Sequence, residues 1–375
     1  MSELERKVKS LALSLGFDRV GITDSAPFDR DEIAADQRVR DGLMDGLPWY
    51  TEERVHRMNR PELLLEDARS VISMAANYNT GPPPGESDDP EVLRGRVARY
   101  AWGRDYHNVI KGRLRRFVRE LPDVVGRPVH TRYFVDDGPM NDRAAAERSG
   151  VGWFGKNTNI LTPTHGSWVF LAQVVTDLDL KPDPPLKKTC GECIRCIPAC
   201  PTDAIVAPYV IDNRKCISFL TIELRGPIPR EMRPMMGDWV FGCDICQEVC
   251  PVNRKAILSG EPDFDKRHDF DAPELIPLLD LDDATFRKRF EGSPIRRAKR
   301  EGLQRNVCVA LGNIGDPVAV PALAAALNSD SQLVRSHAAW ALGKIGGDEA
   351  RVALERALED EEDEGVREEI VSALE

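Results

Sequence analysis

The chain has 375 residues, of which 42% are hydrophobic and 30% are charged. This balance supports buried cores in roughly two or three domains and excludes a wholly disordered chain. The formal net charge of −11 argues against a protein that binds nucleic acid through its overall charge. The N-terminal residues lack the features of a secretory signal, and no run of about 18 apolar residues occurs, so we expect a cytoplasmic protein with no membrane partner.

The first 177 residues alternate predicted helices with predicted strands. Helices are expected at residues 2–15, 106–120 and 142–149, and strands at 18–23, 69–78, 131–136 and 167–176. Residues 80–91 are rich in Pro, Gly and acidic side chains and are expected to form a loop. The pattern predicts an α/β or α+β domain that ends near residue 177, followed by a Pro-rich linker.

Eight of the nine cysteines lie between Cys190 and Cys250, which in a reducing compartment indicates metal binding rather than disulfides. The first group, Cys190 to Cys200, has the spacing C-x2-C-x2-C-x3-C-P. The second group repeats C-x2-C-x3-C-P from Cys243 to Cys250, but an insertion separates it from Cys216. This spacing is typical of bacterial ferredoxins that hold two 4Fe–4S clusters.

The position before each proline predicts crossed ligation, because in two-cluster ferredoxins that cysteine binds the other cluster. One cluster is expected to take Cys190, Cys193, Cys196 and Cys250. The other is expected to take Cys200, Cys216, Cys243 and Cys246. Two zinc sites of four thiolates each are the alternative, which the repeated three-residue gap before proline disfavours. The ninth cysteine, Cys308, lies among apolar residues and is expected to be a core thiol.

The last third of the chain contains an internal repeat. ALGNIGD at 310–316 recurs as ALGKIGG at 341–347, and each copy precedes an apolar helical pattern, at 318–327 and 349–358. A partial third copy begins near Val366. Helical pairs with this period resemble HEAT repeats. Such repeats either bind a partner or cap the C-terminal end of the fold, and we favour partner binding.

Three polar motifs precede the cysteines. The turn GVGWFGKN at 150–157 partly matches nucleotide-binding loops, but a helix is predicted before it and none after it, which disfavours that interpretation. Asp105 is expected to cap the helix that begins near His107. Asp136 ends a predicted strand before a Gly-Pro turn, where a carboxylate either lines a catalytic cleft or forms an Asx turn.

Together, the segments RYAWGRDYHNVI, RYFVDDGP, GVGWFGKNTNIL and GCDICQEVCPVN resemble the epoxyqueuosine reductase family, and the resemblance covers nearly the whole chain. It implies two 4Fe–4S clusters and a cobalamin, which we expect to be bound base-off because no cobalt-ligating histidine is evident in the sequence. It also implies reduction of epoxyqueuosine to queuosine at the wobble position of tRNA anticodons. The family's catalytic acid falls on Asp136. This chain has Asp137 and Asp142 where the family usually has Thr and Glu, and a second carboxylate beside Asp136 is expected to raise the pKa of the pair. The cobalamin contacts implied by the resemblance are Arg57, Asn157, Ser167 and Ser218.

The expected fold class is α+β with three domains. They are an α/β cobalamin-binding catalytic domain at 1–177, a ferredoxin-like double-cluster domain at 178–270 and HEAT-like helical repeats at 271–375. A reductive dehalogenase-like cobalamin enzyme and an iron–sulfur electron-transfer adaptor are the alternative functions. We expect a monomer that receives electrons from an external low-potential donor.

The charge is unevenly distributed along the chain. Residues 348–375 carry a net charge of −9, so the other 347 residues carry only −2. Residues 287–305 carry a net charge of +6. This basic run either forms a solvated helix face or contacts tRNA phosphates, through Arg296, Arg297, Lys299 and Arg300.

Overall fold

The computed structural model describes residues 2–82 and 92–375, so most of the loop expected at residues 80–91 lies outside the described residues. The chain divides into two compact units, each built from three segments. The first comprises Met1–Gly81, Arg104–Asn213 and Ile245–Asp265, and the second comprises Pro82–Gly103, Arg214–Asp244 and Lys266–Glu375. The three domains divided at residues 177 and 270 are a different partition, which stays a prediction. Among the described residues, no helix has both the length and the apolar character needed to cross a bilayer.

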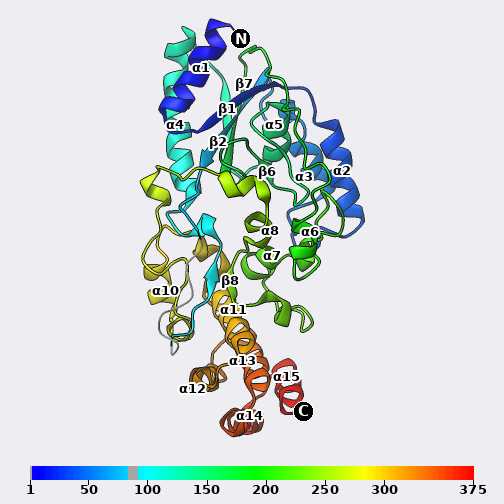
Figure 1. Ribbon diagram of the computed structural model, residues 1–375, viewed down its shortest axis with the longest axis vertical. Helices are drawn as coiled ribbons and strands as arrows, with labels where there is room; N and C mark the ends of the chain where they lie inside the picture. The colour runs from blue at the N-terminus through cyan, green and yellow to red at the C-terminus, as the bar shows by residue number, and fades with distance from the viewer. Residues whose placement is uncertain (1, 83–91) are drawn as a thin grey trace. The chain divides into compact units, whose positions relative to one another are not determined.

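The first unit is built on a four-stranded antiparallel sheet in the order β1-β2-β7-β4. The strands are β1 Arg19–Asp24, β2 Ser70–Asn77, β7 Val169–Thr176 and β4 Thr131–Phe134. All eight residues of β2 are buried, because helices cover both faces of the sheet. Figure 1 shows α1 Glu3–Ser14 and α4 Tyr106–Val125 on one face and α5 Asp142–Arg148 on the other. The expected strands and helices are thereby confirmed.

Alanines of α5 pack directly on the sheet. Ala144 and Ala145 are fully buried in a cluster that includes Val71, Val175 and Phe134. A helix face lined with alanine approaches a sheet closely, because methyl groups need little space between the two layers. Phe134 ends β4, so this packing holds both ends of the connection at residues 135–141. That connection carries the candidate catalytic carboxylate.

Two helices, α2 Asp29–Arg40 and α3 Glu52–Met58, were not expected from the sequence. The only buried side chains are Ala35 in α2 and Val55 in α3. With so few buried positions, neither helix has the apolar periodicity by which a helix is recognised. The first turn of α3 is stabilised instead by a cap, because Thr51 accepts a hydrogen bond from the backbone N–H of Arg54 at 3.2 Å.

Short elements complete the region before the repeats. A hairpin of β5 Trp153–Phe154 and β6 Ile160–Leu161 carries the glycine-rich turn, which is therefore not a strand-turn-helix nucleotide loop. The short helices of the first unit are η1 Pro61–Leu63, α6 Cys196–Ala199, α8 Ile245–Glu248, η5 Pro251–Lys255 and η6 Pro262–Phe264. The second unit pairs β3 Arg96–Val97 with β8 Trp239–Phe241 in parallel and includes η2 Arg99–Ala101, α7 Ile217–Ile222, η4 Arg233–Met236, α9 Ile276–Leu279, α10 Asp283–Arg289 and η7 Pro294–Ala298. One further turn, η3 Asn213–Lys215, spans the point in the sequence where a segment of the first unit ends and one of the second unit begins.

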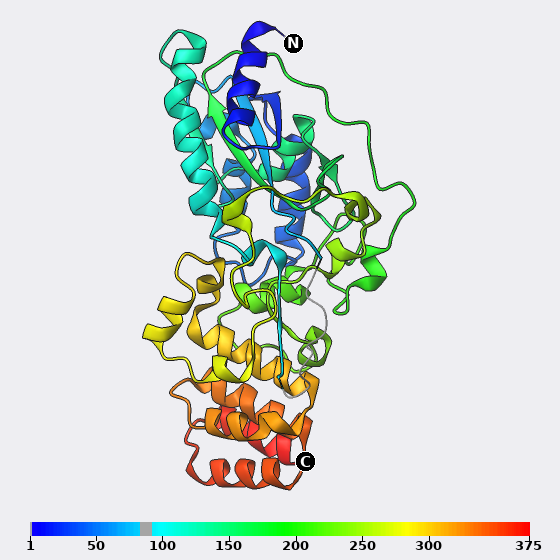
Figure 2. The ribbon, with the colours of Figure 1, turned by 60° about the vertical axis from the view of Figure 1, so that its left-hand side comes forward.

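The C-terminal helices of the second unit form the expected repeats. They are α11 Lys299–Ile314, α12 Val320–Ala326, α13 Gln332–Ile345, α14 Asp348–Asp360 and α15 Glu364–Leu374, with the turn η8 Pro317–Ala319 before α12. Helices α11, α13 and α15 pack in succession, and α12 and α14 pack beside them (Figure 2). The repeated glycines have a physical role here. A Cβ on Gly312 would lie 2.7 Å from Trp340, and one on Gly343 would lie 2.6 Å from Ala373, so each glycine lets two neighbouring helices touch.

Arg305 connects the first repeat helix, α11, to the insertion that separates Cys216 from Cys243. It is fully buried in α11 and donates hydrogen bonds to the backbone carbonyls of Leu220, Leu224 and Gly226 at 2.5 to 2.9 Å. Replacing Arg305 by Met keeps the apolar stem but leaves these buried acceptors unpaired, at about 1–3 kcal/mol each. We expect a loss of about 3–5 kcal/mol and a thermal midpoint about 6–20 °C lower, measured by circular dichroism. The exposed Arg287→Met is the control, and equal midpoints for the two variants would contradict the prediction.

Candidate active site and metal centres

The candidate catalytic carboxylate, Asp136, lies on the surface directly after β4. Its backbone has a φ of 54°, in the left-handed region that non-glycine residues seldom occupy. Its Oδ2 accepts a hydrogen bond from the Tyr106 hydroxyl at 2.8 Å. Two residues later, a Cβ on Gly138 would lie 2.2 Å from the Phe134 ring, so this turn needs glycine. Strained, exposed carboxylates held by one specific partner are typical of functional sites.

The side chain of Tyr106 is itself held in place. Tyr106 is the first residue of α4, where Asp105 caps the helix by accepting from the backbone N–H of His107, as expected. The Tyr106 ring stacks on Phe170 of β7 with centroids 4.2 Å apart and on His107 at 4.1 Å. The hydroxyl that reaches Asp136 therefore projects from a buried aromatic stack, which limits the orientations available to the carboxylate.

Asp137 does not have the raised pKa expected for a carboxylate beside Asp136. Burial acts to raise the pKa of Asp137, but the hydrogen bond from Lys111 and another from the backbone N–H of Val135 outweigh it and lower the pKa. At neutral pH Asp137 is therefore an ion-paired carboxylate. Of the two adjacent aspartates, Asp136 is the better candidate for proton transfer.

A third carboxylate, Asp142, has the raised pKa instead. Its Oδ1 is buried and has no hydrogen-bond partner among the described residues. Burial, reinforced by the negative charge of Asp136, raises the pKa of Asp142 well above its usual value. Gln173 donates to the Asp142 backbone carbonyl at 3.2 Å and so holds this residue at the start of α5. The sequence shows the carboxylate but not its burial, which comes from the packing of α5 on β7.

The pKa of Asp142 has a consequence for stability. A raised pKa means that the folded chain keeps a proton which the unfolded chain releases near pH 4, so this residue destabilises the fold increasingly as pH rises. Asp142→Asn cannot lose a proton. We expect its free energy of unfolding to fall less than that of the native chain between pH 5 and pH 8, in urea titrations. The lowered pKa of Asp137 affects the pH dependence of stability only below about pH 4, so Asp137→Asn is the control whose profile should parallel that of the native chain between pH 5 and pH 8. An Asp142→Asn profile that also parallels the native one would contradict the assignment.

The structure brings one complete set of expected cluster ligands together within the first unit. Burial raises the pKa of both Cys196 and Cys250, and the charges of Cys190 and Cys193 add to the rise for each. Four thiols that repel one another when ionised are a suitable donor set for a cationic iron–sulfur cluster. Cys250, from the second group, lies with the three cysteines of the first group, as crossed ligation requires.

The second set of ligands is divided between the two units. Cys200 and Cys246 belong to the first unit, and Cys216 and Cys243 to the second. The Sγ of Cys200 accepts a hydrogen bond from the backbone N–H of Ala204 at 3.4 Å, a contact typical of cluster thiolates. Ligation of a second cluster by these four cysteines stays a prediction. Cys308 is fully buried in the repeat core, where burial raises the pKa of its thiol to about 12, as expected for an unreactive core residue.

Comparisons with known proteins place this arrangement in a family. The family described as "4Fe-4S double cluster binding domain" matches residues 189–253, "Epoxyqueuosine reductase QueG, DUF1730" matches residues 58–137 and "HEAT repeats" matches residues 295–375. The epoxyqueuosine reductase of Xanthomonas campestris pv. campestris is 40% identical over 91% of this chain and 96% of its own length. That of Bacillus cereus is 34% identical over 100% of this chain and 97% of its own. The chain belongs to the epoxyqueuosine reductase family.

Solved structures of epoxyqueuosine reductases have the same fold. One, in complex with an epoxyqueuosine-modified tRNA-Tyr stem loop, superposes with a TM-score of 0.93 at 33% identity and covers 99% of this chain and 98% of that one. The enzyme of Bacillus subtilis, with its catalytic aspartate loop swung out of the active site, superposes with a TM-score of 0.91 at 33% identity over the same shares of both chains. These matches confirm the α+β fold class, the double-cluster domain and the helical repeats.

The four residues predicted to bind cobalamin differ in burial and in the compact unit to which they belong. Arg57 is exposed on α3, and Ser218 is half-buried in α7 of the second unit. Asn157 and Ser167 are buried and tied to the second cysteine group, Asn157 by donating to the Cys246 carbonyl at 3.2 Å. Ser167 Oγ accepts hydrogen bonds from two side-chain amides of that region at 2.9 Å.

One buried hydrogen-bond donor without an acceptor makes the glycine-rich turn compatible with a bound cofactor. The indole N–H of Trp153 is buried and has no acceptor among the described residues. An unpaired buried donor is costly unless a ligand or water accepts from it. The carbonyl groups at the edge of a corrin would supply such an acceptor. The turn is therefore compatible with the cobalamin expected from the sequence, and both the cofactor and its individual contacts stay predictions.

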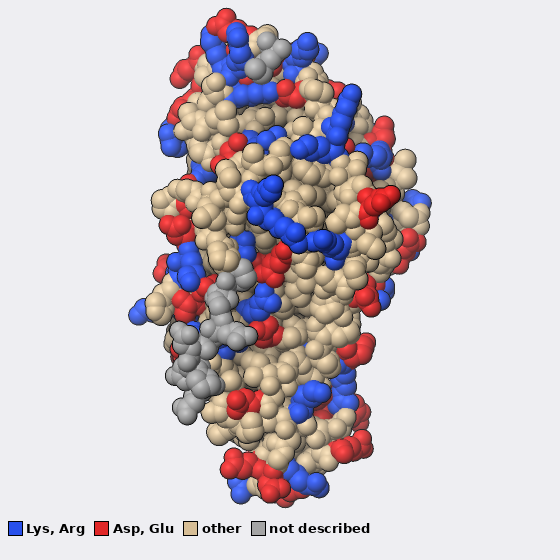
Figure 3. All heavy atoms as spheres, in the orientation of Figure 1, with Lys and Arg blue, Asp and Glu red and all other residues tan. Residues whose placement is uncertain are grey.

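The basic run presents fewer unpaired charges than its sequence indicates. Arg300 is only 14% exposed and bridges two aspartates at 3.1 Å, and Arg297 pairs with a glutamate at 2.7 Å. Arg296 and Lys299 are exposed, and no ion pair involves either of them within the described residues. On the face in Figure 3, acidic and basic side chains alternate around the repeats, whereas Lys and Arg side chains form a row elsewhere. Clustered basic side chains are therefore not limited to this run.

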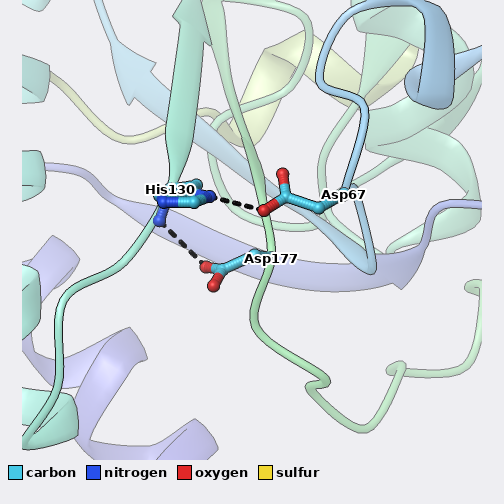
Figure 4. Close-up of side chains that lie close together, drawn as sticks. All are labelled: Asp67, His130 and Asp177. Carbon is cyan, nitrogen blue, oxygen red and sulfur yellow. Dashed lines mark hydrogen bonds and ion pairs between the residues drawn. The ribbon is translucent and has the colours of Figure 1, made fainter.

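Asp67, His130 and Asp177 form the one group among the described residues with the spacing of a metal site outside the cysteines, with ligand atoms within 4.8 Å of one another (Figure 4). Asp177 is already engaged, because it accepts from the backbone N–H of His130 at 3.0 Å and from Arg127 at 2.7 Å. The hydrogen bond to Asp67 raises the pKa of the His130 imidazole. These contacts tie the start of β4 to the end of β7, and we interpret the group as structural.

Proposed function

We propose that this chain reduces epoxyqueuosine to queuosine at the wobble position of tRNA in the cytoplasm. One observation carries the proposal: the exposed carboxylate of Asp136, held by the Tyr106 hydroxyl, lies in the same unit as a convergent set of four cysteines. Relatives named epoxyqueuosine reductase share 34–40% identity with this chain over 91–100% of its length. The combination of a positioned acid with electron-carrying centres is what removal of an epoxide oxygen needs.

The chemistry assigns a defined role to Asp136. Conversion of the epoxide to an alkene takes two electrons and two protons and releases the oxygen as water. An alkoxide is a poor leaving group, so a proton must reach the oxygen as the C–O bond breaks. Protonated Asp136 donates that proton, and Tyr106 orients the carboxyl group toward the substrate. Burial and the charge of Asp136 raise the pKa of Asp142 and so favour its neutral form, which adds no second negative charge beside the substrate.

The electrons are proposed to come through two 4Fe–4S clusters with crossed ligation. A bound, base-off cobalamin would supply the metal-centred two-electron chemistry at the epoxide. Its proposed contacts are Arg57, Asn157, Ser167 and Ser218. The proposed partners are tRNA, in part through Arg296 and Lys299, and an external low-potential electron donor. We propose that the protein acts as a monomer.

The test compares anaerobically reconstituted protein with and without added cobalamin. We expect a shift in the visible absorption of cobalamin on binding. We also expect loss of epoxide from an epoxyqueuosine-containing anticodon stem loop when a chemical reductant is present. Failure to bind cobalamin would overturn the proposal and favour the electron-transfer adaptor. Binding of cobalamin with dehalogenation of an aryl halide, but no reaction of the stem loop, would favour the dehalogenase-like alternative.

A further inference from the structure

A cluster of one tryptophan, one tyrosine and three arginines lies beside the Asp136 loop, and no role above explains it. We name it the Trp49 patch, and its members are Arg38, Trp49, Tyr50, Arg54 and Arg143. Trp49 lies in the connection between α2 and α3, and its side chain is 43% exposed. All five residues belong to the first compact unit.

Arg54 links the tryptophan to the candidate catalytic loop. Its guanidinium lies over the Trp49 ring, 4.8 Å from the centroid. It also donates a hydrogen bond to the carbonyl of Gly138 at 3.0 Å, two residues beyond Asp136. One contact of this arginine therefore orients the indole plane, while the other holds the indole at a defined position relative to the carboxylate.

The rest of the patch is positively charged. Tyr50 contacts Trp49 edge to face, with ring centroids 5.7 Å apart. Burial raises the pKa of the Tyr50 hydroxyl, and the positive charges of Arg143, Arg38 and Arg54 partly offset the rise. The negative charge of Asp36 adds to the rise, so three guanidinium groups and one carboxylate act on this hydroxyl. Arg143 is exposed and immediately follows Asp142. Arginines that surround a half-exposed aromatic ring match a stacked base with phosphates on either side.

We propose that the Trp49 patch binds an unpaired nucleotide of the RNA substrate next to the modified base, with its base stacked on Trp49 and its phosphates near Arg143 and Arg54. The inference rests on the proposed function, because it places the nucleotide adjacent to the one whose epoxide reaches Asp136. A tryptophan that only packs in a core is on average largely buried. Here the indole is held by Arg54 and leaves a large apolar surface beside the catalytic loop.

The experiment measures binding rather than turnover, with an unmodified anticodon stem loop that carries 2-aminopurine on one side of the wobble base. Stacking on Trp49 should quench the probe fluorescence when the native protein binds. For Trp49→Ala we expect the dissociation constant to rise about 5- to 150-fold and the quenching to be lost. Trp49→Phe should retain most of the affinity, because a phenyl ring also stacks. Ile33→Ala, an exposed apolar residue on α2, is the matched control and should bind as the native protein does.

The outcomes separate this inference from the proposed function. Unchanged affinity and quenching in a folded Trp49→Ala protein that still reduces epoxyqueuosine would overturn the inference alone. No binding of the stem loop by the native protein would overturn the inference and count against the proposed function. The affinity lost in Trp49→Ala should persist at high salt, whereas that lost in Arg143→Gln should shrink, because only the phosphate contact is screened. Equal salt dependence of the two losses would contradict the separate roles of base and phosphate contacts.

Discussion

Asp136→Asn is expected to lower the turnover of epoxyqueuosine by about 100- to 10,000-fold, which is the usual contribution of general acid catalysis. Asparagine keeps the shape of the side chain and still accepts the hydrogen bond from Tyr106, but it has no acidic proton to give. Single-turnover rates with reconstituted enzyme and a modified stem loop measure the effect. The visible spectra of the clusters and the affinity for cobalamin should be unchanged, because Asp136 contacts neither in this proposal.

Two variants show whether the loss is specific to this acid. Tyr106→Phe removes the hydroxyl but leaves the ring stacked on Phe170, so we expect a smaller loss of about 10-fold and a shifted pH profile. Asp137→Asn breaks the ion pair with Lys111 and should retain most of the activity. If Asp137→Asn were the inactive variant and Asp136→Asn the active one, the assignment of the proton donor would be reversed.

Cys250→Ser is expected to reduce turnover below detection and to remove about half of the bound iron, because one of the two clusters loses a ligand. Crossed ligation predicts which cluster is lost. The electron paramagnetic resonance spectrum of Cys250→Ser should match that of Cys196→Ser, whose thiol lies with Cys250 in the first unit. It should differ from the spectrum of Cys246→Ser, although Cys246 is the closer neighbour in sequence.

Cys308→Ala is the control for the loss of a thiol as such. Its thiol is buried among apolar side chains of the repeats, so the full iron content should remain. If the spectrum of Cys250→Ser matched Cys246→Ser instead, each cysteine group would hold its own cluster. Crossed ligation would then be wrong.

Much of the fold could be predicted because its elements have strong local patterns. Strand β2 is mostly apolar and entirely buried, and α1 and α4 have helical spacing of apolar residues. The repeat was visible because Gly312 and Gly343 perform the same packing task in two helices. Helices α2 and α3 could not be predicted because each buries only one side chain, and their position depends on caps and on contacts made by arginines.

The sequence alone determined the chemistry that this protein can perform. Cysteine spacing before proline indicates iron–sulfur ligation, since this spacing is typical of proteins that hold two 4Fe–4S clusters. The tertiary structure decided how the environments of the three carboxylates differ. Asp136, Asp137 and Asp142 look alike in sequence, but Asp136 is held by Tyr106, Asp137 is paired with Lys111, and the Oδ1 atom of Asp142 is buried without a hydrogen-bond partner among the described residues. The charge and pKa of a carboxylate depend on burial and on groups far away in sequence, and only folding brings those groups together.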